Sequence, residues 1–203
     1  LPNNAKPELG PLATAYGEIF RYELVSDGFH DLMELRTLND WVVIPRLLRA
    51  SGVADVSNSG GLEKQFTIRF LPADLERFGL TLSDVVDAVQ NNNASGGGSV
   101  LQRGSMSFVI RGNGALENLA QIENTFVKSV GGSPVFLRDV ARIELDHLTP
   151  SGIFSRDDRD DSVEGIVLMR RGENPSKVLI HVEDAISELN STVLPEGVRI
   201  EPF

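Results

Sequence analysis

No cysteine occurs among the 203 residues, which rules out a disulfide framework and thiolate metal ligands. Long apolar runs are missing too, since the longest has about five residues and a membrane-spanning helix needs about 20. Basic residues are in the minority, at 19 Lys and Arg against 29 Asp and Glu. The net charge of −10 argues against nucleic acid or an anionic membrane surface as a partner, because both would repel the chain.

Catalytic motifs are missing as well. The sequence contains no G-x-S-x-G, no phosphate-binding P-loop, no H-E-x-x-H and no paired general acid and base. Its three histidines, His30, His147 and His181, are scattered, and no carboxylate stands at a spacing that would complete a tetrahedral zinc site. We therefore predict that the chain is not an enzyme and has no cofactor, catalytic residue or metal site.

The apolar content, 41% of the residues, is enough for one large core or two smaller ones. A strand–helix–strand pattern that occurs once near each end of the chain favours two. The chain begins at Leu1 rather than Met, and we expect it to be a segment of a longer protein.

The second copy of this pattern starts at Val163. Its apolar run is too short for a buried helix, and it ends at Arg170-Arg171-Gly172 as a strand would. Asn174 is typical of a helix N-cap, and Pro175 suits the first helical position, where a missing N–H costs nothing. Apolar residues then recur on one helical face, at Val178, Val182, Ala185 and Leu189. A closing strand is predicted from Val198.

The first copy starts at Tyr16. An alternating strand leads to a turn at Asp27-Gly28, a helix, and a return strand from Val53. The helix has one apolar face, made of Leu35, Leu38 and Val42. Pro45 lies inside this helix, where it removes the hydrogen bond to the carbonyl of Trp41, and we expect a kink near that turn.

Two strand–helix–strand units make the ferredoxin-like plan, in which a four-stranded sheet carries both helices on one face. About ninety residues separate the halves here, far more than an ordinary connection, so a folded module must lie between them. The sequence indicates its elements: a strand over 66–70, a helix that begins at Thr81, a strand over 106–111, a short helix over 116–122, and a hairpin around Gly131-Gly132. The helix at Thr81 is predicted to begin with a capping box from Thr81 to Asp84 and to carry one apolar face, made of Leu82, Val85, Val86 and Val89. The predicted fold class is α+β, a split ferredoxin-like domain with an inserted α+β module.

Two sets of side chains could bind a cation. The acidic run of Asp157, Asp158, Asp160 and Asp161 offers carboxylates to a hard ion, but Arg156 and Arg159 supply nearer counter-charges, so we interpret the run as a solvated hairpin. Soft copper(I) or silver(I) would need thioethers, and the methionines are Met33, Met106 and Met169. Met169 lies in an apolar strand, so a thioether relay has no visible support.

Four stretches, in the same order along the chain, resemble the periplasmic porter region of resistance-nodulation-division (RND) efflux pumps. They are residues 1–22, 70–93, 137–143 and 165–178. The phrases DWVVIP, GLEKQF and RRGENPS are most similar to the heavy-metal branch, the cobalt-zinc-cadmium and copper-silver exporters.

This resemblance implies a division into subdomains. Residues 15–70 together with 150–203 would form the second amino-terminal porter subdomain, 71–149 the docking subdomain inserted into it, and 1–14 the tail of the preceding porter subdomain. It also implies a homotrimer in the inner membrane, driven by the proton gradient, that exports substrate through a periplasmic adaptor protein and an outer-membrane channel. This segment would lie on the periplasmic face of the membrane and not within it.

The resemblance also implies roles for two sets of residues. Phe20, Leu62 and Ile153 fall where related drug exporters line a substrate pocket, and ordinary core packing is the alternative. The polar tract over 91–99 falls in a hairpin that reaches into the neighbouring protomer in the family, and a plain flexible loop is the alternative. The contact residues expected in that tract are Asn91, Asn92, Asn93, Gly96, Gly97 and Gly98.

Three functions remain open from the sequence. The preferred one is a transporter segment that walls a periplasmic conduit for heavy-metal cations. The second is the same architecture exporting organic compounds. The third is a free-standing periplasmic protein that binds a metal or small molecule on the ferredoxin-like sheet.

Overall fold

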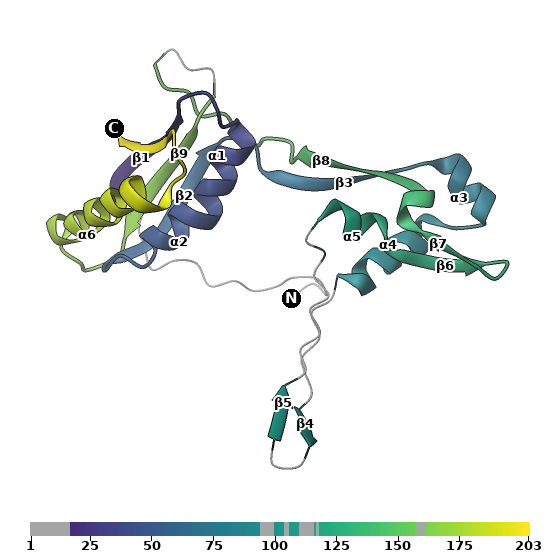
Figure 1. Ribbon diagram of the computed structural model, residues 1–203. Coiled ribbons are helices and arrows are strands. Elements are labelled where there is room, and N and C mark those ends of the chain that lie inside the picture. The colour runs from purple at the N-terminus through teal and green to yellow at the C-terminus, as the bar shows by residue number, and fades with distance from the viewer. Residues whose placement is uncertain (1–16, 94–99, 104–105, 110–115, 117, 158–160) are drawn as a thin grey trace. The chain divides into compact units, whose positions relative to one another are not determined.

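The computed structural model describes residues 17–93, 100–103, 106–109, 116, 118–157 and 161–203 (Figure 1). These residues form two units. The first contains the residues up to Lys64 and from His147 onward, and the second contains Gln65–Asp146. In the described part of the chain, no helix is both long and apolar enough to cross a membrane.

The first unit is built on a four-stranded antiparallel sheet. Its strands are β1 (Glu18–Ser26), β2 (Val53–Gly60), β9 (Val163–Met169) and β10 (Val198–Pro202), in the order β10-β1-β9-β2. Each strand–helix–strand unit therefore encloses one strand of the other, so that Leu24 of β1 faces both Ile200 and Val163. This interlocked order is the ferredoxin-like plan and confirms the α+β prediction.

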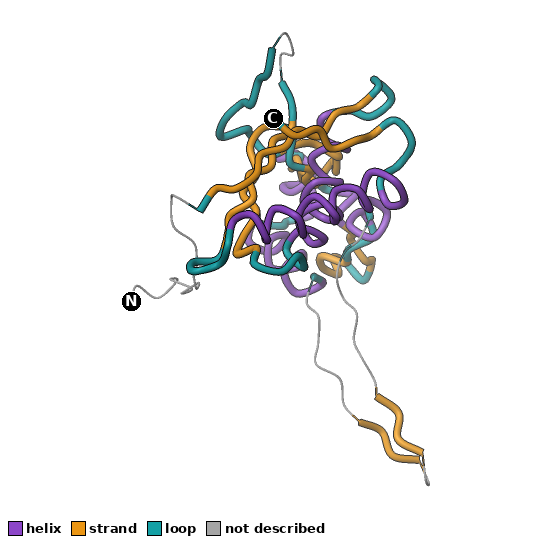
Figure 2. The backbone as a smooth tube through the Cα atoms, turned by 90° about the vertical axis from the view of Figure 1, so that its left-hand side faces the viewer, coloured by secondary structure: helices purple, strands orange, loops and turns teal. Residues whose placement is uncertain are grey.

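Two helical runs cover the same face of this sheet (Figures 1 and 2). The first is α1 (Leu32–Leu38), the π-helical turn η1 (Asn39–Val43) and α2 (Ile44–Leu47). The second is α6 (Pro175–Glu188) with the π-helical turn η3 (Leu189–Val193). The predicted N-cap is confirmed, because the Asn174 side chain accepts a hydrogen bond from the Ser176 N–H and Pro175 is the first helical residue.

The perturbation expected from Pro45 takes the form of the π turn. In η1, which directly precedes Pro45, the Ile44 N–H donates to the carbonyl of Asn39, five residues back. The wider turn shifts the buried face, so the run buries Leu35, Asn39, Val43 and Leu47. Of the expected apolar face, Leu35 is buried, and Leu38 and Val42 are half-buried and pack against the core.

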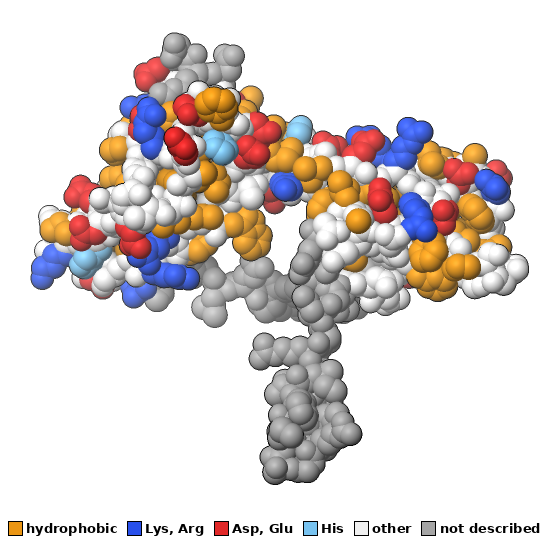
Figure 3. Space-filling view, in the orientation of Figure 1, with side chains coloured by type: hydrophobic (Ala, Val, Ile, Leu, Met, Phe, Trp, Pro, Cys, Tyr) orange, Lys and Arg blue, Asp and Glu red, His pale blue; other side chains and the backbone are white. Residues whose placement is uncertain are grey.

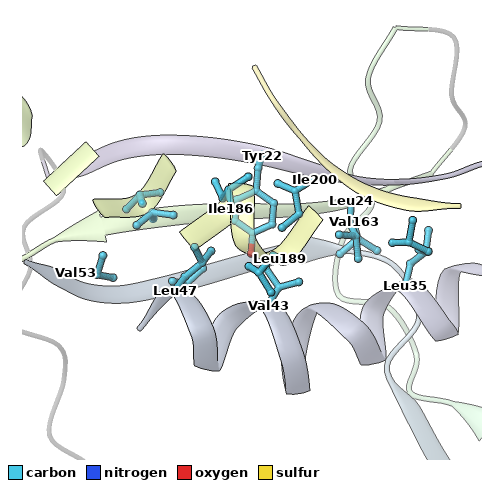
Figure 4. Close-up of a cluster of buried hydrophobic side chains, with 14 of the residues drawn as sticks. Tyr22, Leu24, Leu35, Val43, Leu47, Val53, Val163, Ile186, Leu189 and Ile200 are labelled. Carbon is cyan, nitrogen blue, oxygen red and sulfur yellow. The ribbon is translucent and has the colours of Figure 1, made fainter. Parts of the chain in front are cut away.

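The core of the first unit lies between the sheet and both helical runs (Figure 4). All four strands and both helical runs contribute to it, through Tyr22, Leu24, Leu35, Val43, Leu47, Val53, Val56, Val163, Val167, Val178, Val182, Ile186, Leu189, Val198 and Ile200. Burying one such side chain contributes about 1.5–3 kcal/mol, so the two distant halves of the sequence stabilise each other.

Tyr22 anchors the middle of this core. Its ring lies directly against Gly165 of β9, where a Cβ atom would come within 2.0 Å of the ring. Its hydroxyl donates a hydrogen bond of 2.8 Å to Oδ1 of Asn39 in η1, and burial raises the pKa of the phenol far above its ordinary value. The side chain therefore ties β1, β9 and the π turn together.

The second unit has its own core, formed by Leu80, Val85, Ile122, Val135, Leu137, Val140 and Ala141. Its elements are β3 (Lys64–Phe70), α3 (Pro72–Phe78), α4 (Leu82–Asn92), β4 (Val100–Arg103), β5 (Met106–Val109), α5 (Leu119–Glu123), β6 (Phe126–Val130), β7 (Ser133–Phe136), the 3-10 turn η2 (Leu137–Asp139) and β8 (Ala141–His147). β3 pairs with β8, β4 with β5, and β6 with β7. Nearly all of β3 belongs to this unit, although the sequence placed residues up to 70 with the other.

Three local predictions for the second unit have different outcomes. The capping box is confirmed, because Thr81 N–H donates to Asp84 Oδ2 at 2.8 Å and Asp84 N–H donates to Thr81 Oγ1. The apolar face of α4 is right for Val85, which is buried, and for Val89, which packs against the core, but it was wrong for Leu82 and Val86, which are exposed. Helix α3 was not predicted, and Pro72 occupies its first helical position.

Candidate functional site

The three residues expected to line a substrate path lie in two different places. Phe20 on β1 is half-buried and lines a hollow of about 370 Å³ together with Leu179 and Phe203. Leu62 is half-buried in the segment after β2, and Ile153 is 73% exposed. Phe20 pairs with Val167 of β9, and Gly60, next to the segment of Leu62, pairs with Val163 of the same strand. The distance between these two positions along β9 places Phe20 roughly 13 Å from the segment of Leu62.

Leu62 and Ile153 adjoin a second hollow, of about 320 Å³, at the end of the sheet where β2 finishes. Their neighbours Gly61, Glu63 and Gly152 line it, together with Arg36. The structure thus relates two of the three predicted residues to one hollow and Phe20 to another. Their part in a substrate path stays a prediction.

Arg36 of α1 holds this end of the sheet in place. Its guanidinium donates to Asp40 at 2.8 Å, to the carbonyl of Gly60 at 2.6 Å and to Asn58 at 3.1 Å, and Asn58 in turn donates to Asp40. All three guanidinium nitrogens have partners inside the protein. Arg36 therefore positions the chain at the hollow, and these hydrogen bonds use three of its five N–H donors.

Two successive glycines make the sharp turn at this hollow. Gly60 and Gly61 have φ of +71° and +67°, in the left-handed region that favours glycine. A Cβ atom at Gly60 would come within 2.0 Å of the Ser162 carbonyl, and one at Gly61 within 2.6 Å of the Val163 side chain. The strap, which we define as the described residues 153–157 and 161–162, can pass this close to Gly60 because that position lacks a side chain, and Gly61 leaves room for Val163 of β9.

Two carboxylates are buried on the side of the sheet opposite the helices. Glu23 of β1 and Glu164 of β9 face each other in register and are 0% and 5% exposed. Arg21 lies 3.4 Å from Glu164, Arg156 lies 3.4 Å from Glu23, and the Ser162 hydroxyl donates to Glu23. Burial raises the pKa of Glu164, and Arg21 opposes that shift.

The strap shields these carboxylates from water. Phe154 stacks on Phe203 with the ring centroids 5.6 Å apart, and the Arg156 guanidinium lies 4.7 Å from the Phe203 ring. Sequence reasoning missed both glutamates, because alternation in β1 puts Glu23 on the face opposite Tyr22 and Leu24, where a charged residue is expected to be exposed. Arg156 and Ser162 of the strap, distant in sequence, contact Glu23 and help to bury it.

The residues considered as metal ligands do not come together in the described structure. Of the acidic run, Asp157 lies 3.7 Å from Arg156, and residues 158–160 lie outside the described part. Met33, Met106 and Met169 belong to α1, β5 and β9. Among the described residues, no group of three or more His, Asp or Glu has the geometry of a metal site. His181 is exposed, with Nδ1 3.2 Å from the Ser51 carbonyl.

The predicted protomer-contact tract begins as a helix end. Asn91 and Asn92 belong to the last turn of α4, and the Asn93 side chain accepts a hydrogen bond from the Leu116 N–H. Gly96, Gly97 and Gly98 lie outside the described residues. Beyond them β4 and β5 pair as an antiparallel hairpin, with Val100 opposite Val109 and Arg103 opposite Met106.

Comparison with known proteins gives matches over the whole chain. The sequence profile of the AcrB/AcrD/AcrF family matches residues 1–203. The putative cation efflux system protein SilA of Salmonella typhimurium is 36% identical and the cation efflux system protein CusA of Escherichia coli is 35% identical, each over 98% of this chain. The cobalt-zinc-cadmium resistance protein CzcA of Cupriavidus metallidurans is 31% identical over the same share.

A solved structure is similar as well. The crystal structure of a heavy metal efflux pump matches 100% of this chain with a TM-score of 0.82 and 40% identity. The match covers 20% of that pump, and this chain spans 19% of the length of SilA, CusA and CzcA.

Proposed function

Because the chain belongs to the AcrB/AcrD/AcrF family, we propose that it is the periplasmic segment of an inner-membrane RND efflux transporter for heavy-metal cations. The observation that carries the proposal is the match of both units, at a TM-score of 0.82 and 40% identity, to a heavy metal efflux pump. SilA and CusA, which are named as cation efflux proteins, support the same substrate class.

In this proposal the two units have different tasks. The ferredoxin-like unit is the porter subdomain and walls part of the substrate conduit, while the inserted unit docks to the outer-membrane channel and to neighbouring protomers. Residues 1–14 are the tail of the preceding porter subdomain. The full-length protein works as a proton-driven homotrimer with a periplasmic adaptor protein. Within it, the hairpin of β4 and β5 and the tract from Asn91 contact the next protomer.

The proposal is tested with the full-length gene. In a host stripped of its own metal exporters, the gene is expected to raise the tolerated concentration of zinc, cobalt, copper or silver salts and to lower the metal content of the cells. Unchanged resistance to every metal, with the protein present in the membrane, would contradict the metal assignment. Raised tolerance of organic dyes under the same conditions would favour export of organic compounds.

The conduit residues are tested within the same pump. Ile153→Ala removes a side chain that is 73% exposed and contributes little to the core, so it is expected to weaken metal resistance without lowering the amount of protein. Phe29→Ala is the matched control, since Phe29 is 88% exposed and was not assigned to the path. Equal resistance of both variants and the parent would remove Ile153 from the conduit.

A further inference from the structure

One end of the first unit gathers positive charge in a chain whose net charge is −10. We call the set of Arg49, Arg170, Arg171 and Lys177 the basic rim. It lies at the end of the sheet where β2 begins and β9 finishes, away from the hollow at Gly60. Figure 3 shows blue Lys and Arg side chains along this lower edge of the unit.

Two stretches that are distant in sequence, 49–53 and 170–178, meet at the rim. The Arg170 N–H donates to the carbonyl of Gly52 at 2.7 Å, and the Arg170 guanidinium donates to the carbonyl of Val53 at 3.3 Å. Val178 packs so closely on Gly52 that a Cβ atom there would come within 2.4 Å of its methyl group. Arg49 precedes this turn and Lys177 precedes Val178, so the fold brings the four cations to one edge.

The charges of the rim are not matched by carboxylates. Arg49, Arg171 and Lys177 are exposed and form no ion pair with any described residue, and Arg170 bonds only to a neutral carbonyl. Elsewhere in this unit Arg21, Arg36, Arg156 and Arg199 all have carboxylate partners. The carboxylates nearby are Glu173 in the β9–α6 turn and, in the hollow that Arg49 shares with Arg46, Asp184 and Glu188, of which Glu188 pairs with Arg46. Together with Arg46 the rim sets five cations against three carboxylates, so a positive excess remains.

The stability of the fold does not account for these cations. Lys177 lies in the first turn of α6, and Arg171 precedes that helix, at an end where the helix dipole favours acidic residues. That first turn contains no acidic residue. The placement costs some stability and increases the attraction of this edge for anions.

The surroundings of the rim suit a broad surface better than a small ion. Its cations project from loops and helix ends, and two exposed apolar side chains lie on the adjoining elements, Leu48 at the end of α2 and Ile180 on α6. Cations interspersed with exposed apolar groups match the headgroup layer of a bilayer, which presents phosphates above an apolar interior. Because salt screens charge beyond about 10 Å, this local excess can outweigh the distant acidic residues.

We propose that the basic rim binds the anionic headgroups of a lipid bilayer, although the net charge alone argues against such a partner. The inference depends on the proposed function in one respect, which is that the proposed function places the chain beside a membrane. It adds a lipid partner for a part of the protein that does not enter the membrane.

The test is sedimentation of the full chain with vesicles. Vesicles made of phosphatidylglycerol and phosphatidylcholine in equal parts are expected to bind the chain at low salt, and vesicles of phosphatidylcholine alone are not. Each basic residue near such a surface is worth about fivefold in partitioning, so R49Q/R171Q/K177Q should weaken binding on the order of a hundredfold. R49K/R171K should retain it.

A charge-matched control separates the rim from net charge. The variant K64Q/R77Q/R142Q removes three cations that lie outside the rim. Like the rim residues, they form no ion pair with any described residue. If this control loses binding as fully as the rim variant, or if the parent chain ignores phosphatidylglycerol, the proposal is overturned. Circular dichroism confirms that each variant is folded. If the full-length pump exports metal but the chain does not bind these vesicles, the proposed lipid binding of the rim is overturned and the proposed function stands.

Discussion

Replacing Gly165 with Ala is expected to destabilise the first unit by about 1–5 kcal/mol. The new methyl group would lie 2.0 Å from Cζ of Tyr22 and 2.3 Å from both Cε1 and the hydroxyl oxygen, so the whole phenol must move. Tyr22 is completely buried, and its hydroxyl is held by Asn39. No direction of retreat keeps both the packing and the hydrogen bond.

The magnitude follows from three contributions. Overpacking a core of this kind costs about 1–3 kcal/mol. Moving the phenol away leaves the buried Asn39 amide without its partner, which costs about 1–3 kcal/mol more, and the nitrogen of that amide already has no partner among the described residues. Alanine recovers about 0.5–1 kcal/mol relative to glycine within a strand.

The measurement is a urea titration followed by the fluorescence of Trp41. This is the only tryptophan in the chain and belongs to η1, so it reports on the first unit. Gly152→Ala is the control, because no atom lies within 4 Å of a Cβ atom there, and it should change stability by less than about 0.5 kcal/mol.

A double-mutant cycle identifies the cause. In a Tyr22→Leu background the clashing atoms are gone, and Gly165→Ala should then cost less than about 1 kcal/mol. The same cost in both backgrounds would refute the contact between Tyr22 and Gly165 as the reason.

Three further predictions concern charged side chains. Asp84→Asn should abolish an acid-sensitive part of the second unit's stability, because hydrogen bonds from Thr81 lower the pKa of Asp84 from 3.8 to about 2. In the parent this contribution is full above about pH 4 and is lost toward pH 2. Urea titrations across that pH range measure it. Burial raises the pKa of Glu164, so the folded state favours its protonated form, and the parent chain should lose stability as the pH rises above 4.5. Glu164→Gln should remove this decline. An unchanged decline in the variant would contradict the reasoning. Arg36→Gln should cost about 2–3 kcal/mol in thermal melts, because it removes the charged donor that Asp40 and the Gly60 carbonyl share, although Asp40 keeps its bond from Asn58. The exposed Arg199→Gln should cost less than about 1 kcal/mol in the same assay.

The architecture of the first unit could be predicted because its signals are local and repeated. Asn174 and Pro175 mark one helix start, and the apolar runs at Tyr22 and Val163 mark two neighbouring strands. The order of the strands then follows from the small number of ways in which two such units interlock.

Features that depend on distant contacts could not be predicted. Periodicity at 3.6 residues per turn placed Leu38 and Val42 on the apolar face, and both pack against the core, but it gave no sign of the π turn that also buries Asn39 and Val43. Glu23 follows the strand alternation and is still buried, because a strap more than a hundred residues later covers it. Likewise, summed charge could not show that four cations collect at one edge.

The interlocked strand order has a consequence for biosynthesis. β9 lies between β1 and β2, so when the ribosome has completed β2 these two strands still lack the neighbour that joins them. The inserted module, whose elements are contiguous, emerges next and can fold first. Until β9 emerges, the apolar side chains of Tyr22 on β1 and Val56 on β2 have no complete sheet to pack in. The nascent chain therefore exposes an apolar surface that chaperones are suited to shield.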